Sequence, residues 1–251
     1  MKLIDGIHPY SRLGPMESLE GARMLEQKLS VLSNEVSNIK TPGFKRQRIT
    51  FEEYFLKQVD ATKRTAKGEV IKGDFSQGTL RETRNPFDFA IEGEGFFVVQ
   101  TPSGIRYTRA GNFSLNAQNQ LVTQEGYLVL GDGAPITLPD TTGKGIWLSS
   151  DGRFYVDETD TAGIDIVTFK NLNGLKRLGG NLWEQTQASG PPRPSETARV
   201  RQGFLEESNT NPLEAMINLV DLFREYEALQ RTLKTQDELD SKSATEVGRV
   251  G

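Results

Sequence analysis

The chain has 251 residues, of which 35% are hydrophobic and 25% are charged, and its 30 basic and 34 acidic side chains give a formal net charge of −4. With no cysteine and a single histidine, His8, the chain cannot form disulfides, Cys-based zinc sites or metal sites that need two histidines. The lack of these residues disfavours most enzyme classes. The small net charge provides no overall attraction to nucleic acid or anionic lipid.

The N-terminal segment, residues 1–43, is predicted to be helical. Between Pro15 and Ile39, apolar residues recur in alternating steps of three and four, the heptad pattern of a helix that packs along another helix. Pro42 and Gly43 end the pattern. The apolar face, a candidate subunit interface, comprises Ala22, Leu25, Leu29, Leu32, Val36 and Ile39.

The middle of the chain has a different periodicity. Residues 44–85 are rich in Lys, Thr and Gly and are predicted to form an extended connecting arm. In residues 86–190, short apolar runs alternate with glycine-marked turns at about ten-residue spacing, which predicts an all-β sandwich or barrel. Residues 191–210 contain several prolines and are predicted to be a connector.

The C-terminal segment, residues 211–251, is also predicted to be helical. Asn211, Pro212 and Glu214 occupy the positions of an N-cap, a first-turn proline and a third-position acid. No proline or glycine interrupts the pattern until Gly248, so the helix could run for about 30 residues, or about 45 Å. Its apolar residues form the second part of the candidate interface: Met216, Leu219, Val220, Phe223, Tyr226 and Leu233.

The predicted fold class is mainly β with long terminal helices. A sandwich- or barrel-like central domain would be flanked by N- and C-terminal helices that pair as an antiparallel coiled coil in the assembly. The apolar stripes on these helices have two interpretations: a helical pair that closes the core, or an interface with neighbouring subunits. The second is favoured, because the β-domain would have its own core and heptad helices with few other contacts need a partner.

Motifs for catalysis are weak. Gly93 and Gly95 resemble part of a phosphate-binding loop, but a third glycine and a following helix are missing and an apolar strand pattern follows, so a hairpin is favoured. Pairs such as Glu92 and Glu94 could serve a glycosidase, but surface carboxylates are common. We therefore predict no catalytic, cofactor or metal site. The longest apolar runs, about four residues, also fall far below the ~20 needed to cross a membrane.

Four segments, in order along the chain, resemble the family of bacterial flagellar basal-body rod proteins, the FlgF/FlgG-type axial proteins. They are residues 33–46, 88–97, 107–113 and 202–212, and the match extends into the C-terminal helix. Within the family, the chain is more similar to proximal than to distal rod subunits. The motif residues are Asn34, Asn38, Thr41, Pro42, Gly43, Phe44, Gly93, Gly95, Phe96, Ser208, Asn209 and Asn211.

The resemblance implies a structural subunit rather than an enzyme, with no cofactor and no small-molecule substrate. It also implies export through the flagellar type III apparatus without a cleaved signal peptide, and polymerisation through the terminal helices into the rod that crosses the periplasm and transmits torque from motor to hook. The implied partners are neighbouring proximal rod subunits, the distal rod protein and the export apparatus, with no nucleic acid and no membrane insertion.

Two alternatives remain open at this point. One is a distal rod or hook-type axial protein of the same family. The other is a carbohydrate-binding or hydrolytic β-domain, which would need a concave site that combines carboxylates with Trp147, Tyr155 or Trp183.

Overall fold

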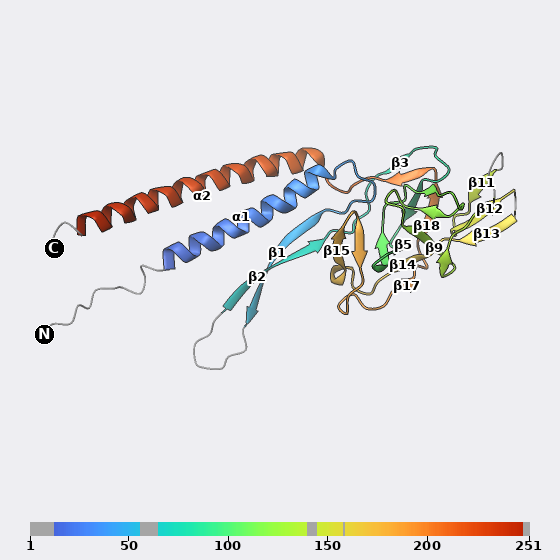
Figure 1. Cartoon of the computed structure of the whole chain (residues 1–251), viewed down its shortest axis with the longest axis horizontal. Helices are drawn as coiled ribbons and strands as arrows, with labels where there is room; N and C mark the ends of the chain where they lie inside the picture. Colours follow the sequence, from blue (N-terminus) through green and yellow to red (C-terminus); the bar gives the residue numbers. More distant parts are fainter. Residues whose placement is uncertain (1–12, 56–64, 140–144, 158, 248–251) are drawn as a thin grey trace. The chain divides into compact units, whose positions relative to one another are not determined.

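The computed structural model describes residues 13–55, 65–139, 145–157 and 159–247 (Figure 1). The chain divides into two compact units. A helical unit is built from the two ends of the chain, residues 1–37 and 211–251, and a β-rich unit comprises Asn38–Thr210. Both ends of the β-rich unit therefore continue directly into the helical unit.

The helical unit contains α1 (Leu13–Ser37, 25 residues) and α2 (Pro212–Val247, 36 residues), which contact each other and run in opposite directions (Figure 1). Helix α2 begins at Pro212 because the Asn211 side chain caps it: Asn211 Oδ1 accepts the backbone N–H groups of Leu213 (3.1 Å) and Glu214 (3.4 Å). Neither described helix is long and apolar enough to cross a membrane.

The shielded face of α2 follows a regular spacing. Ala215 and Leu222 are buried, with 3% and 5% of their surface exposed. Further half-buried positions continue the alternating steps of four and three residues that place side chains on one side of a helix. These half-buried positions are Leu219, Tyr226, Leu229 and Leu233.

The described strands of the β-rich unit form five separate sheets, and all pairs are antiparallel. The largest has ten strands, with the main order β15-β16-β6-β5-β9-β8-β7, while β10 pairs with β9, and β14 pairs with both β5 and β17. Its strands are β5 (Phe96–Thr101), β6 (Gly104–Thr108), β7 (Ser114–Leu115), β8 (Leu121–Val122), β9 (Leu128–Gly131), β10 (Ala134–Pro135), β14 (Ile166–Thr168), β15 (Lys176–Gly179), β16 (Leu182–Glu184) and β17 (Arg193–Pro194).

Four small sheets complete the unit. A three-stranded sheet has the order β11-β12-β13, and three pairs join β1 to β2, β18 to β4 and β19 to β3. In the last two pairs, strands from the end of the unit pair with strands near its beginning. These strands are β1 (Gln47–Phe55), β2 (Thr65–Gly73), β3 (Leu80–Glu82), β4 (Phe89–Glu92), β11 (Ile146–Leu148), β12 (Arg153–Val156), β13 (Thr159–Gly163), β18 (Arg199–Gln202) and β19 (Phe204–Glu206).

The main core of the β-rich unit is rich in phenylalanine. Phe89 meets Phe154 edge to face at a centroid distance of 5.4 Å, and Phe97 meets Phe113 in the same way at 5.2 Å. A second cluster contains Trp183, which is 3% exposed. The two clusters give the β-rich unit a core of its own.

The predicted architecture is wrong, although the chain is mainly β with a sheet-rich central domain as expected. The described strands form five sheets rather than a closed barrel or a two-sheet sandwich, because many have only two to four residues and offer too short a ladder to close a barrel. The predicted pair of long terminal helices in a coiled coil is also not shown. Helix α1 has 25 residues, and the apolar residues expected on one face of α2 lie on two.

Candidate functional site

Segments from all four sequence motifs contribute contacts at one place in the β-rich unit. The backbone N–H of Gly43 donates to the backbone carbonyl of Glu206 (2.7 Å). Lys45 Nζ donates to Glu206 Oε1 (2.6 Å), and Arg109 Nη1 donates to Glu206 Oε2 (3.3 Å). Arg109 Nη2 donates to the carbonyl of Gly93 (2.7 Å). We call this set of five residues the motif junction.

The charged groups of the motif junction are buried. The side chains of Lys45 and Glu206 are fully shielded, and that of Arg109 is 3% exposed. Glu206 Oε1 also accepts the backbone N–H of Gly78 (2.9 Å), and Lys45 Nζ also donates to the carbonyl of Ser76 (2.6 Å). One carboxylate thus contacts two buried cations, an arrangement in which losing the anion leaves uncompensated charge in a low-dielectric environment.

Burial also changes the acid–base behaviour of the two cations. Desolvation lowers the pKa of both Lys45 and Arg109, and the nearby Glu206 carboxylate acts in the opposite direction. Arg109 Nε is buried and has no hydrogen-bond partner among the residues that the structure describes. Glu206 is therefore the main anion that compensates both cations, with smaller contributions from Asp74 to Lys45 and from Glu94 to Arg109.

Backbone geometry explains why residue 43, beside the motif junction, is a glycine. Gly43 has a φ of +68°, and a Cβ atom there would collide with the backbone of Arg109 and Ala110. The carbonyl of Pro42 accepts a hydrogen bond from Asn181 Nδ2 (3.0 Å). The adjacent Phe44 is fully buried, with the Arg177 guanidinium 4.5 Å from its ring centroid.

A second set of contacts holds the exit of the β-rich unit. Asn209 Oδ1 accepts the backbone N–H of Arg46 (2.9 Å), and Asn209 Nδ2 donates to the carbonyls of Asp74 (2.8 Å) and Ser76 (3.1 Å). Ser208 Oγ accepts the backbone N–H of Thr210 (3.1 Å). The segment that enters the β-rich unit and the segment that leaves it are thus joined by hydrogen bonds of the Asn209 side chain as well as by the Lys45–Glu206 ion pair.

Asp74 lies beside these amide contacts and pairs with Arg46 Nε and Arg48 Nη2, each at 2.9 Å. Burial acts to raise the pKa of Asp74, but hydrogen bonds from Ser76 and the interaction with Arg46 outweigh it and hold this pKa well below its usual range. Asp74 is therefore ionised throughout the neutral range.

The other motif residues lie around the junction or outside it. Phe96 is 1% exposed and meets Phe75 edge to face, and the Arg109 guanidinium lies 5.6 Å from its ring centroid. Gly95 is buried and packs against Ile166. Thr41 Oγ1 donates to Asn38 Oδ1 (3.1 Å) in the turn after α1. Two residues belong to the helical unit: Asn34, which is exposed on α1, and the cap residue Asn211.

The expected interface residues do not form one surface. On α1, Ala22, Leu25, Leu29, Leu32 and Val36 are half-buried, as is Ile39 beyond the helix end. On α2, Leu219, Tyr226 and Leu233 lie on the shielded face, whereas Met216, Val220 and Phe223 are 52%, 50% and 46% exposed.

Two residues that the sequence analysis missed belong with the exposed positions. Leu213 is 69% exposed and Ile217 is 52% exposed. The signal was available, since positions 213, 217 and 220 follow the spacing of one helical face. We call this surface the exposed face of α2, and it comprises Leu213, Met216, Ile217, Val220 and Phe223.

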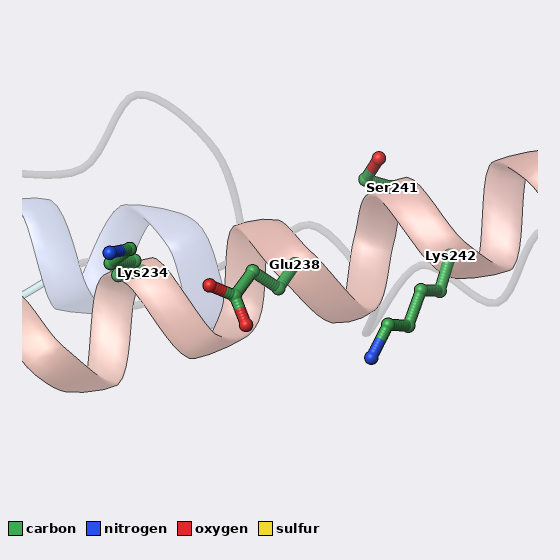
Figure 2. A pocket seen from close by; sticks show the side chains of 4 residues that line it. All are labelled: Lys234, Glu238, Ser241 and Lys242. Atoms are coloured by element: carbon green, nitrogen blue, oxygen red, sulfur yellow. The ribbon is translucent and has the colours of Figure 1, made fainter.

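The aromatic residues of the carbohydrate alternative do not come together. Trp147 stacks on Tyr155 with a centroid distance of 4.2 Å, while Trp183 is buried in the second core cluster. The surface hollow in Figure 2 lies along α2, and its described lining contains no aromatic residue: Lys234, Glu238, Ser241 and Lys242. Among the described residues, no three His, Cys, Asp or Glu side chains gather as a metal site would require.

Comparisons with known proteins give a consistent result. Residues 90–159 match the family model of the flagellar hook protein FlgE/F/G D1 domain, and residues 201–246 match that of the flagellar basal body rod FlgEFG protein C-terminal region. The chain is 31% identical to the flagellar basal-body rod protein FlgG of Bacillus subtilis, over 88% of this chain and 94% of the relative. It is 30% identical to the flagellar basal-body rod protein FlgF of Caulobacter vibrioides, over 90% and 94%, and 31% identical to FlgF of Mesorhizobium japonicum, over 90% and 97%.

Proposed function

The chain belongs to the flagellar basal-body rod proteins of the FlgF/FlgG type, and from this premise we propose that it polymerises through its terminal helices. It is a structural subunit of the flagellar rod, because its relatives are named flagellar basal-body rod proteins. The finer assignments, which concern the interface, the neighbours and the mechanics, are the proposal.

The observation that carries the proposal is the exposed face of α2. Five large apolar side chains lie within about three turns of one helix, each 46–69% exposed. Contiguous apolar patches on a monomer mark interaction sites. Full burial of such a side chain contributes about 1.5–3 kcal/mol, so several together can offset the cost of association. We assign this face to the contact with a neighbouring rod subunit.

The α1 residues have a different role in the proposed assembly. They are already half-buried in the monomer, so their burial against a neighbour would add less apolar area for each residue. The proposed interface therefore consists of the exposed face of α2 with the accessible parts of the α1 residues around Leu25 and Leu29. This division ranks the α2 residues above the α1 residues as targets for mutation.

Membership of the family supports the remaining parts of the proposal. The chain is exported by the flagellar type III apparatus and assembles with other rod subunits in the part of the basal body that crosses the periplasm. There it transmits torque from motor to hook. The sequence favours a proximal position in the rod. A distal position is the alternative, because FlgG-named and FlgF-named relatives match at the same level of identity. Antibody labelling along purified basal bodies distinguishes the two positions.

The decisive experiment uses Val220→Asp, which places a charge on the exposed face of α2. Asn218→Asp, at an exposed polar position of the same helix, is the matched control. In cells that lack the wild-type chain, we expect Val220→Asp to abolish rods in electron micrographs of basal bodies, and Asn218→Asp to form them. Both purified variants should keep the wild-type circular dichroism spectrum. Normal rods with Val220→Asp would refute the proposed interface.

A further inference from the structure

The two ends of the β-rich unit are held together by three buried charged side chains. Lys45 belongs to the segment that enters the unit, and Glu206 to the segment that leaves it, 161 residues later. Arg109, from the middle of the chain, contacts the same carboxylate and anchors it to the carbonyl of Gly93. We call Lys45, Arg109 and Glu206 the clasp.

The backbone ladders around the clasp are short. Strand β19 pairs with β3 over three residues and β18 pairs with β4 over four, each in a two-stranded sheet. Two-stranded sheets are marginally stable on their own. The exit segment is also held by its buried side chains Val200 and Leu205, and the side-chain contacts of the clasp and of Asn209 are what join it directly to the entry segment.

None of the three clasp residues belongs to either apolar core cluster. If the Glu206 charge is removed, two buried cations remain, and their repulsion and desolvation favour opening of this corner to water. Phe89, Phe97 and the other core side chains can stay packed during such an opening. Loss of the clasp should therefore separate the two ends of the unit without unfolding its core.

We infer that the clasp is a positioning device, which fixes the separation of the two chain ends that continue into α1 and α2 and thereby presets the subunit for assembly. Glu206 is the central positioning residue because it contacts both cations. The role in assembly rests on the proposed function, whereas the fixed separation of the chain ends is a property of the monomer. The two parts can therefore be tested separately.

The monomer test measures a distance between two spin labels. Because the chain contains no cysteine, Lys40→Cys and Glu207→Cys introduce the only labelling sites, both in the β-rich unit. Lys40 is exposed, and the side chain of Glu207 is 45% exposed. We expect a narrow distance distribution in the full-length chain, a broad one after Glu206→Gln, and a narrow one after the control Glu82→Gln. Glu82 lies opposite Phe204 on the partner strand, and its side chain is 54% exposed.

A second variant and a second measurement guard against general unfolding. Lys45→Met combined with Glu206→Gln keeps the net charge of the clasp but removes its bridging contact, and should also broaden the distribution. Amide hydrogen exchange should accelerate in β19 more than in β5. An unchanged distribution in both variants, or equal acceleration in β19 and β5, would overturn the clasp.

The assembly test uses the same variants without labels, in cells. We expect loss of rods and of swimming with Glu206→Gln, and wild-type behaviour with Glu82→Gln. Broad distances with normal rods would overturn the positioning role. By contrast, normal rods with Val220→Asp would overturn the helix interface and leave the distance result of the clasp intact, so the two failures are distinguishable.

Discussion

Lys45 and Glu206 lie 161 residues apart in the sequence, yet their charged atoms lie 2.6 Å apart and neither side chain is exposed. Arg109 joins them from a third segment. Three of the segments that identify the family in the sequence thus supply one buried cluster. The physical role of these motif segments is to close the β-rich unit at the point where the chain enters and leaves it.

The first prediction concerns the stability that this cluster provides. Glu206→Gln should lower the free energy of unfolding by about 3–5 kcal/mol, because it leaves two buried cations without their anion. Glu82→Gln, at an exposed ion pair, should change it by less than about 1 kcal/mol. Denaturant unfolding followed by tryptophan fluorescence, to which the buried Trp183 and the exposed Trp147 both contribute, measures both. Adding Lys45→Met to Glu206→Gln should restore part of the loss, and strictly additive losses would argue against direct coupling.

A second prediction concerns the close backbone approach at Gly111. A Cβ atom there would collide with the carbonyl of Phe89, at the edge of the main core. Gly111→Ala should therefore destabilise the β-rich unit by about 1–3 kcal/mol, the usual cost of overpacking. Gly145→Ala is the control, since its Cβ would meet no atom within 4 Å, and it should stay within about 0.5 kcal/mol. Equal thermal unfolding midpoints for the two variants would contradict this geometry.

A third prediction concerns pH. The pKa of Asp74 in the folded chain is held below its ordinary value of 3.8, so below about pH 4 the unfolded chain binds more protons than the folded one. The stability that Asp74 contributes is complete above that range and is lost as the pH falls through it. Asp74→Asn should lower stability at neutral pH, and the difference from the wild type should shrink in acid. Unfolding free energies that run parallel from pH 7 to pH 2 would contradict this assignment.

A fourth prediction separates the two apolar faces of α2. Leu222 is 5% exposed on the shielded face, so Leu222→Ala should destabilise the helical unit by about 2–5 kcal/mol. Val220 is 50% exposed, and Val220→Ala should leave the isolated chain within about 0.5 kcal/mol of the wild type. Thermal unfolding followed by circular dichroism at 222 nm compares the two. A larger loss for Val220→Ala would show that its face is already covered in the monomer.

The sequence by itself was sufficient to identify the family and the type of local structure. The cap at Asn211 and the two-residue periodicity of the middle segment depend on neighbours along the chain, and such signals survive without tertiary information. The end of the first helix was placed less accurately, since α1 stops at Ser37, five residues before Pro42. Four ordered motifs with compatible spacing identified the rod family, which the relatives show.

Only the tertiary structure decided how the strands combine and which apolar residues remain exposed. Periodicity does not reveal which strands pair, so it predicted a barrel or sandwich where the described strands form five separate sheets. Helical spacing placed Met216 and Leu219 in one interface, but burial separates them because only one side of α2 is shielded. The cluster of Lys45, Arg109 and Glu206 could not be predicted from the sequence, because contacts across 161 residues leave no local pattern. Each of these charged residues, considered alone, resembles a solvated surface residue.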